Sequence, residues 1–228
     1  NISNWISKEK KLSPKIHIEP YPIIRNLRYG ENPHQEAKWY GLENSGWNAA
    51  KQIQGKSLSF NNLLDLEAAL ATVLEFGYSD DSKLKSPDLS HAAVILKHNN
   101  PCGAAISDSS SIAFKKALEC DSTSAFGGIV AFNKIVDLET AKLLSDIFLE
   151  CIVGPSFTKE ALAILSNKKN LRLLELNKDI IDKSYKGSSK TIMGGLLVQD
   201  SDNKSINTNE WNTVTQNKPS DLQFKDLI

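Results

Sequence analysis

Ile129-Val130-Ala131-Phe132 is a short apolar run with no polar residue inside it. Three further runs of strand length are rich in apolar residues, at 92–96, 151–153 and 171–176. Runs of this kind are typical of strands that are covered on both faces of a sheet. Segments of helix length, with apolar residues at helical spacing, lie nearby at 111–119, 137–149 and 158–166. The alternation predicts an α/β fold with three layers, in which helices cover both faces of a parallel sheet.

One more helix is predicted before this region. Asn61 or Asn62 can cap a helix over 63–76, and Gly77 supplies a left-handed stop. The apolar residues of this segment return at helical spacing, which predicts that one of its faces is buried.

The ends of the chain are less regular. The prolines in residues 1–24 suit an arm or a linker, and the Lys- and Ser-rich segment 177–190 predicts a surface loop. A strand is expected at 193–199, and residues 200–220 are polar and predicted to be irregular.

Composition excludes several classes of protein. The 228 residues contain 27 Lys+Arg and 27 Asp+Glu, so the formal net charge is zero. A balanced charge argues against a protein that works mainly by electrostatic attraction to nucleic acid or to an anionic membrane. No apolar run approaches the roughly 18 residues that a membrane-spanning helix needs.

The cysteines point to a reducing compartment. Cys102, Cys120 and Cys151 form an odd and sparse set without a C-x-x-C pair. Such a set does not make a disulfide framework, and there is no N-terminal signal pattern, so a cytoplasmic location is expected.

The first candidate site is Lys97-His98-Asn99-Asn100-Pro101-Cys102-Gly103, which begins where a predicted strand ends. Ligand sites in open parallel sheets favour the carboxyl ends of strands. His98 can accept a proton near neutral pH, and Lys97 can stabilise an oxyanion as it forms. On local spacing alone, a solvated pair at a turn is the alternative interpretation.

Two other chemistries can be weighed at the same segment. Cys102 near His98 suggests a thiol nucleophile, but proximity in sequence does not give the required geometry, and a small buried cysteine in a turn is the favoured interpretation. A zinc deaminase needs His-x-Glu and a later Pro-Cys-x-x-Cys. Asn100 stands where the Glu is required and Ala105 where the second Cys is required, so no catalytic zinc is expected.

Three weaker candidates lie elsewhere. Phe126 could stack on a flat heterocycle, and Gly127 with Gly128 allows close approach of a ligand to the backbone. Arg28 beside Tyr29 offers a planar guanidinium that suits phosphate. Glu150 precedes a buried strand, and an exposed residue in the last turn of a helix is its alternative interpretation. For the two glycines, the alternative is a simple turn, and for Arg28 it is a solvated side chain in a loop.

Five blocks together resemble a known family, the bifunctional purine biosynthesis proteins, in their bacterial form. These proteins join an IMP cyclohydrolase to an aminoimidazole carboxamide ribonucleotide (AICAR) transformylase. The blocks follow the family's order and are Leu27–Gln35, Gln54–Asn62, Lys97–Gly103, Asp121–Gly128 and Gly194–Asp200.

The resemblance implies formyl transfer from 10-formyltetrahydrofolate to the 5-amino group of AICAR. It implies a transformylase built from two cytidine-deaminase-like halves without zinc, of which this chain is the first. His98 matches the family's proton acceptor and Lys97 the group that stabilises the transition state. The matching nucleotide-binding positions are Arg28, Tyr29, Gly127 and Glu150.

The resemblance also implies an organisation. Residues 1–24 match the arm after the cyclohydrolase domain, 25–221 the first transformylase subdomain and 222–228 the start of the second. A homodimer is implied for the intact protein, with AICAR ribonucleotide and folate as its ligands and no metal in this half. This chain alone is expected to have no useful transformylase activity. The alternatives are a catalytically silent nucleotide-binding module and a thiol enzyme that uses Cys102.

Overall fold

The structure is a computed structural model that describes residues 21–79, 90–184, 188–200 and 210–226. The chain divides into two compact units, of which the first ends at Ser184. Residues 1–20, which make up most of the predicted arm, lie outside the described ranges.

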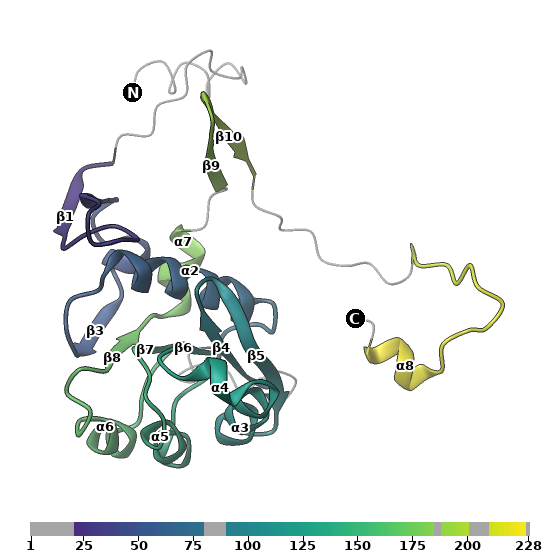
Figure 1. The fold of residues 1–228 in the computed structure, drawn as a ribbon. Coiled ribbons are helices and arrows are strands. Elements are labelled where there is room, and N and C mark those ends of the chain that lie inside the picture. The colour runs from purple at the N-terminus through teal and green to yellow at the C-terminus, as the bar shows by residue number, and fades with distance from the viewer. Residues whose placement is uncertain (1–20, 80–89, 185–187, 201–209, 227–228) are drawn as a thin grey trace. The chain divides into compact units, whose positions relative to one another are not determined.

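A six-stranded mixed sheet forms the centre of the first unit, with the strand order β3-β8-β7-β6-β4-β5 (Figure 1). Its strands are β3 (Lys51–Gln54), β4 (His91–Lys97), β5 (Asn100–Ser107), β6 (Ile129–Phe132), β7 (Cys151–Gly154) and β8 (Arg172–Glu175). The neighbours β6, β7 and β8 are parallel, whereas β3, β4 and β5 run antiparallel to their neighbours. The α/β class is confirmed, but the prediction of a parallel sheet is wrong for these three strands.

Helices cover both faces of this sheet, so the predicted three layers are confirmed (Figure 1). One face packs against α3 (Ser110–Cys120), α5 (Leu138–Ser145) and α6 (Lys159–Leu165), and the other against α2 (Phe60–Leu74) and α7 (Lys178–Ser184). The short helix α4 (Ser122–Ala125) follows α3. The likeness of this arrangement to a cytidine deaminase stays a prediction.

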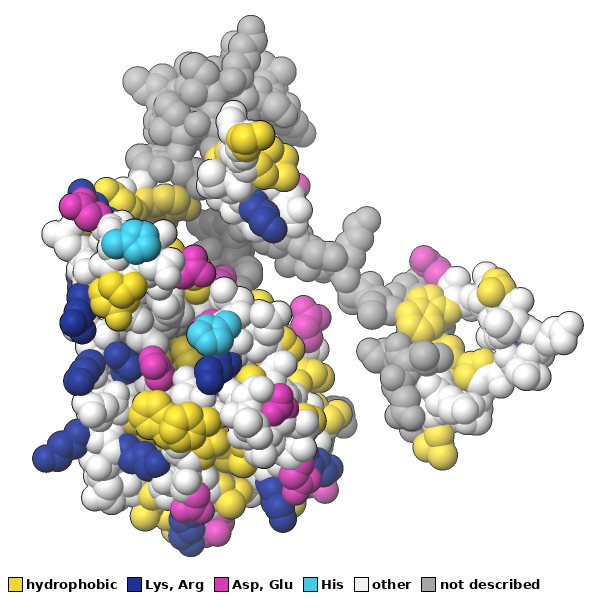
Figure 2. All heavy atoms as spheres, in the orientation of Figure 1, with side chains coloured by type: hydrophobic (Ala, Val, Ile, Leu, Met, Phe, Trp, Pro, Cys, Tyr) yellow, Lys and Arg dark blue, Asp and Glu magenta, His cyan; other side chains and the backbone are white. Residues whose placement is uncertain are grey.

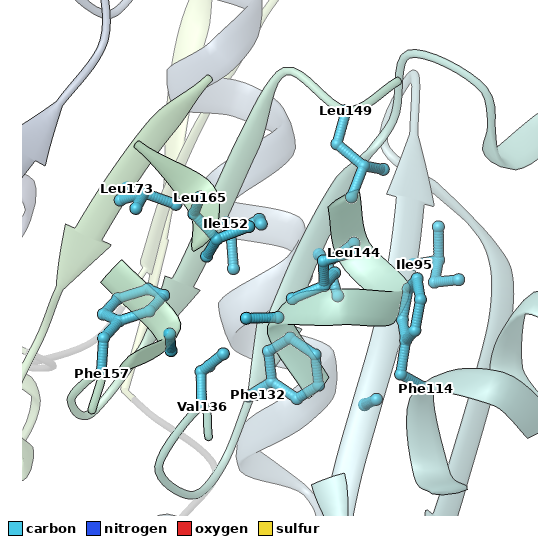
Figure 3. Close-up of a cluster of buried hydrophobic side chains, with 14 of the residues drawn as sticks. Ile95, Phe114, Phe132, Val136, Leu144, Leu149, Ile152, Phe157, Leu165 and Leu173 are labelled. Carbon is cyan, nitrogen blue, oxygen red and sulfur yellow. The ribbon is translucent and has the colours of Figure 1, made fainter. Parts of the chain in front are cut away.

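Alternation along the strands builds the two cores. Ile152 and Leu173 point to the side of α3, α5 and α6, where Figure 3 shows them among buried side chains. The next residue of each strand, Val153 or Leu174, points to α2 on the other face. Successive side chains of a strand alternate between faces, and burial of each large apolar side chain contributes about 1.5–3 kcal/mol. Helices and sheet are therefore held together from both sides.

The start of α2 differs from the prediction by a few residues. The N-cap is Ser59, whose side chain accepts a hydrogen bond from the backbone N–H of Asn62. The Asn62 side chain accepts from the backbone N–H of Ser59 in return, which completes a capping box. The helix thus begins at Phe60, and neither Asn61 nor Asn62 is its N-cap. Gly77 has a φ of 74°, as predicted for the stop.

The edge strand β5 was not predicted from the sequence. It contains Pro101 and Gly103, which are rare inside strands, but an edge strand tolerates a proline. A Cβ atom at Gly103 would overlap the carbonyl oxygen of Ala117, so β5 can lie this close to α3 only with glycine here. A two-residue turn joins β4 to β5, and such a turn requires antiparallel strands.

Two other predictions are corrected. The helix predicted to run to 149 ends at Ser145, so Phe148 lies outside it and is half exposed. The surface loop predicted at 177–190 contains α7, whose start is capped by Asn177 and whose Ile181 is buried. Two adjacent isoleucines are too few to show a helical period, so this short helix had no apolar signal.

A small hairpin precedes the sheet. It pairs β1 (Ile23–Leu27) with β2 (Ala37–Tyr40), and a short 3-10 helix, η1 (Gly46–Asn48), follows. Internal hydrogen bonds order the loop between β1 and β2. The N–H of Gly30 donates to the carbonyl oxygen of Gln35 at 2.8 Å, and the N–H of Asn32 donates to the Gln35 side chain at 2.7 Å.

The second unit contains one hairpin and one helix among its described residues. The hairpin pairs β9 (Ser188–Ile192) with β10 (Gly195–Gln199), which confirms the strand predicted at 193–199. The helix is α8 (Asp221–Asp226). None of the helices in the described ranges combines the length and the apolar character that crossing a bilayer requires.

Candidate functional site

The register of the sheet aligns the predicted site residues along one edge. Leu96 of β4 pairs with Ile129 of β6, Ile129 pairs with Cys151 of β7, and Cys151 pairs with Arg172 of β8. Lys97-His98 follows Leu96, whereas 127–128 and Glu150 come directly before β6 and β7. All of these positions therefore lie at the same edge of the sheet, meaning the edge that is formed by the ends of its strands and not by the edge strand β5.

Antiparallel pairing of β4 is the reason for this convergence. The edge consists of the carboxyl end of β4 and the amino ends of β6, β7 and β8. In an all-parallel sheet, Lys97-His98 and Glu150 would lie at opposite ends. Lys97-His98 follows its strand and Gly127 and Glu150 precede theirs, as the sequence indicates, and the antiparallel β4 brings these strand ends together.

The turn between β4 and β5 carries His98. Lys97 pairs with Asn100, and the two residues between them have positive φ angles, 53° for His98 and 60° for Asn99. The Asn100 side chain donates to the His98 carbonyl oxygen at 2.8 Å. Non-glycine residues in this left-handed region cost about 1–3 kcal/mol each, and such residues cluster at functional sites. His98 itself is exposed.

Helix α2 holds this turn from the side. The backbone N–H of Asn99 donates to Asp65 Oδ1 at 2.8 Å. When the side-chain amide of Asn99 is oriented to donate, its nitrogen lies 3.2 Å from Asp65 Oδ1 and 3.1 Å from the Leu64 carbonyl oxygen. The Asp65 carboxylate of α2 therefore fixes the left-handed turn, although Asp65 lies outside the turn.

Lys97 is oriented by the loop before β6. Its ammonium nitrogen donates to the carbonyl oxygen of Phe126 at 2.7 Å. A lysine ammonium has three donors, so this bond leaves two for a ligand. Among the described residues, the ion pairs of the structure do not include Lys97. Its positive charge is thus available at this edge of the sheet.

Gly127 adopts a φ of 77° and extends the ladder between β6 and β7. Its N–H donates to the Phe148 carbonyl oxygen at 2.8 Å, and the N–H of Glu150 donates to the Gly128 carbonyl oxygen at 3.0 Å. A ligand contact to the backbone of Gly127 would therefore use its carbonyl oxygen. The rings of Phe126 and Phe148 lie 5.2 Å apart, with exposed fractions of 60% and 50%.

Glu150 is held by two side chains. Its Oε2 accepts from the Asn62 side chain at 2.7 Å and lies 3.7 Å from a guanidinium nitrogen of Arg172. The Arg172 Nε donates to the carbonyl oxygens of Lys56 and Ser57, at 3.1 and 3.3 Å. The alternative of an exposed residue in the last turn of a helix is wrong for Glu150, because α5 ends at Ser145 and two side chains engage the Glu150 carboxylate.

Arg28 and Tyr29 lie on the loop between β1 and β2. Arg28 is exposed, and its guanidinium carbon lies 5.5 Å from the centroid of the Tyr29 ring. The loop reaches the start of α2, where the Asn61 side chain donates to the Glu31 carbonyl oxygen at 3.3 Å. The structure thus links this loop to the same helix end that contacts Glu150.

The cysteines do not form a reactive site. Burial raises the pKa of the Cys102 thiol, and the nearby Asp121 carboxylate raises it further. Burial also raises the pKa of Cys151 to about 12. A raised pKa disfavours the thiolate that a nucleophile needs, and Cys102 packs against the apolar core. The thiol-enzyme alternative therefore has no support in the structure.

Alkylation of the native chain is expected to follow a fixed order. Cys120 is exposed and is expected to react first, Cys102 more slowly, and Cys151 only after unfolding, because thiolate formation and access both limit the reaction. Mass spectrometry of the protein after timed exposure to iodoacetamide at pH 7.5 measures the three rates. Reaction of Cys102 several-fold ahead of Cys120 would reinstate the thiol nucleophile.

Three residues of the site were not singled out from the sequence as site residues. From the sequence, Asn62 is a candidate helix cap, and Asp65 and Arg172 carry no signal of a site, because a charged residue in a helix or at a strand end is usually solvated. The only available signal was the position of Asn62 inside the block 54–62. The other two contacts depend on residues more than twenty positions away.

The site is open and contains no recognisable metal cluster. Histidine, basic, acidic and apolar side chains lie close together on the face of the first unit seen in Figure 2. In the described part of the chain, no group of three or more His, Cys, Asp or Glu side chains could hold a metal ion. Cavities of about 300 Å³ beside Trp39 and about 710 Å³ beside Trp211 are not lined by the predicted site residues.

Comparisons with known proteins agree in one family. A protein-family model described as AICARFT/IMPCHase bienzyme matches residues 1–228. The bifunctional purine biosynthesis protein PurH of Prochlorococcus marinus (strain MIT 9515) is 62% identical over 226 residues, which cover 99% of this chain and 43% of the relative. The PurH of strain NATL2A is 50% identical over the same coverage. The chain spans less than half the length of these relatives.

One solved structure shares a weak likeness of shape. The crystal structure of a putative formate dehydrogenase accessory protein from Desulfotalea psychrophila gives a TM-score of 0.40 at 10% identity. The match covers 61% of this chain and 56% of that one. A likeness this weak carries no argument about the chain.

Proposed function

The chain belongs to the AICARFT/IMPCHase bienzyme family, and on that premise we propose that it supplies the catalytic base and much of the nucleotide site of an AICAR transformylase. The reaction is formyl transfer from 10-formyltetrahydrofolate to the 5-amino group of AICAR ribonucleotide. It is a step of purine biosynthesis, with folate as co-substrate and no metal in this half.

One observation carries the proposal. His98 and the ammonium group of Lys97 lie at the same sheet edge as Gly127 and Glu150. The Lys97–Phe126 hydrogen bond of 2.7 Å connects the segment of His98 to the loop that contains Gly127. Four positions that the family resemblance singled out are thus neighbours, although they come from separate segments of the chain. A base, a cation that has no ion-pair partner among the described residues, and hydrogen-bond acceptors together suit acyl transfer to an amine.

The roles of His98 and Lys97 follow from the chemistry. The substrate amine is a weak nucleophile, since its lone pair is delocalised into the ring and the carboxamide. As the nitrogen attacks the formyl carbon, His98 accepts a proton from it, and Lys97 stabilises the oxyanion on the former formyl oxygen. The bond from that carbon to N10 of the folate then breaks, and N10 takes up a proton as tetrahydrofolate leaves.

The nucleotide contacts use the remaining residues. Arg28 is exposed and binds the phosphate, for which its planar fork is suited. Tyr29 lies beside it and packs against the nucleotide. The carbonyl oxygen of Gly127 and the Oε1 atom of Glu150 accept hydrogen bonds from amino or hydroxyl groups, since the Gly127 N–H and Glu150 Oε2 are already engaged.

The rest of the site comes from outside this chain. His98 and the pair Phe126–Phe148 are exposed, so water reaches the reacting groups unless another element covers them. We propose that the folate contacts lie in the remainder of the relatives' length and that the complete cytoplasmic protein works as a homodimer. Residues 1–24, 25–221 and 222–228 are proposed as the arm, the first subdomain and the start of the second.

A chimera tests the proposal. In it, this chain replaces the 226 matched residues of the relative from strain MIT 9515, which supplies the missing length. The chimera is expected to form tetrahydrofolate from 10-formyltetrahydrofolate only when AICAR ribonucleotide is present, whereas residues 1–228 alone are inactive. Nucleotide binding by the chimera without formyl transfer would instead favour the catalytically silent module.

A further inference from the structure

We infer that Asp65, on the polar edge of α2, is a positioning residue that holds the His98 turn in its catalytic geometry. The polar edge consists of Asn61, Asn62 and Asp65. The inference rests on the proposed function and names a residue for that same site.

Each residue of the polar edge contacts a different segment of the site. Asn61 donates to Glu31 in the loop of Arg28 and Tyr29, at 3.3 Å. Asn62 donates to the carboxylate of Glu150 at 2.7 Å, and Asp65 accepts from the backbone N–H of Asn99 at 2.8 Å. Residues three and four apart share one face of a helix, so a single edge of α2 serves three segments that are remote in sequence.

The apolar face of α2, which adjoins the polar edge and includes the buried Asn62, fixes this edge in place. Leu66, Leu70 and Val73 are almost fully buried against the sheet. The capping box between Ser59 and Asn62 sets the first turn of the helix. The polar edge therefore belongs to an anchored element, and its side chains can impose positions on the loops that they contact.

Of the three residues of the polar edge, Asp65 is expected to affect catalysis most, because it holds the turn that carries His98. His98 and Asn99 both adopt positive φ angles that non-glycine residues rarely take. The bond from the Asn99 N–H ends on a charged acceptor, and such bonds are shorter and stronger than neutral ones. Among the described residues, the ion pairs do not include Asp65, and its carboxylate instead accepts the hydrogen bond from the turn.

A comparison of Asp65→Ala with Asp65→Asn in the chimera tests the inference. Asp65→Ala is expected to lower kcat about 10- to 100-fold with little change in KM for AICAR ribonucleotide, because misplacement of a catalytic group by about 1 Å costs that much. Asp65→Asn keeps an acceptor oxygen and is expected to recover most of the rate. Glu75→Ala, at the other end of α2, serves as the matched control and is expected to leave kcat unchanged.

A purely structural role for Asp65 would give a different result. In that case both Asp65 variants would lower the melting temperature without changing kcat in the folded fraction, and the inference would be overturned. An equal loss of kcat in Asp65→Asn and Asp65→Ala would overturn it as well, because asparagine keeps the acceptor oxygen that is proposed to hold the Asn99 N–H.

Amide hydrogen exchange of residues 1–228 gives a test that does not depend on activity. Asp65→Ala is expected to speed exchange of the Asn99 N–H at least 10-fold and to shift the His98 amide resonance, with helix α5 unaffected. Unchanged exchange at Asn99 would overturn the inference. An inactive unsubstituted chimera would overturn the proposed function, while the exchange result would still decide whether Asp65 holds the turn.

Discussion

Replacement of His98 by asparagine is expected to lower kcat of the chimera about 10²- to 10⁴-fold, which is the range that a positioned general base contributes. Asparagine tolerates the left-handed backbone better than most residues, so the turn with a φ of 53° at position 98 is kept. The loss then reports on the imidazole and not on the fold. Steady-state formation of tetrahydrofolate measures it.

A matched control makes the His98 result decisive. His34→Asn is the matched control, because His34 is an exposed histidine on the loop before β2. Retention of more than about a tenth of the rate in His98→Asn would be inconsistent with a general base at this position.

Removal of the charge at position 97 is the second large effect. Lys97→Gln is expected to lower kcat about 10²- to 10³-fold, as is typical for the loss of one group that stabilises an oxyanion. Glutamine retains a donor that can reach toward the Phe126 carbonyl oxygen, so the loop before β6 keeps its main contact. The change therefore removes the cation while it disturbs the surrounding structure little.

The control for Lys97 is a lysine with an ordinary surface role. Lys51 lies on β3 and pairs with Glu175 at 3.0 Å, with 74% of its side chain exposed. Lys51→Gln is expected to change neither kcat nor KM, because exposed ion pairs contribute at most about 1 kcal/mol to stability. If Lys97→Gln raised KM for the nucleotide and left kcat unchanged, Lys97 would bind the ground state rather than stabilise the oxyanion.

The fold class could be predicted from the sequence because buried strands carry a strong apolar signal. The strand predicted at 129–132 has the same bounds in the structure, and the helices predicted to start at 137 and 158 have their N-caps at these positions, Asp137 and Thr158. Strand direction could not be predicted in this way, since apolar runs do not encode it. The two-residue turn that reverses β4 into β5 also lacks the Asn-Gly pair that usually marks a hairpin.

The candidate site was predictable only in part. The segment with Lys97 and His98 was found because a base and a cation adjoin at a strand end, and the family resemblance supplied Arg28, Tyr29, Gly127 and Glu150. That resemblance could not show that Gly127 has its N–H occupied or that Arg172 restrains Glu150. Both facts depend on the register of β6, β7 and β8, which brings distant segments together.

Calorimetric titration of AICAR ribonucleotide into residues 1–228 tests the central claim most directly, with the phosphate-free riboside as the control ligand. The account predicts that the nucleotide binds more tightly than the riboside. It also predicts that Arg28→Ala removes this difference, at about 10- to 100-fold in affinity for the loss of a charge-assisted contact. Equal binding of nucleotide and riboside, or no binding to either this chain or the chimera, would contradict the assignment of a nucleotide site to this half.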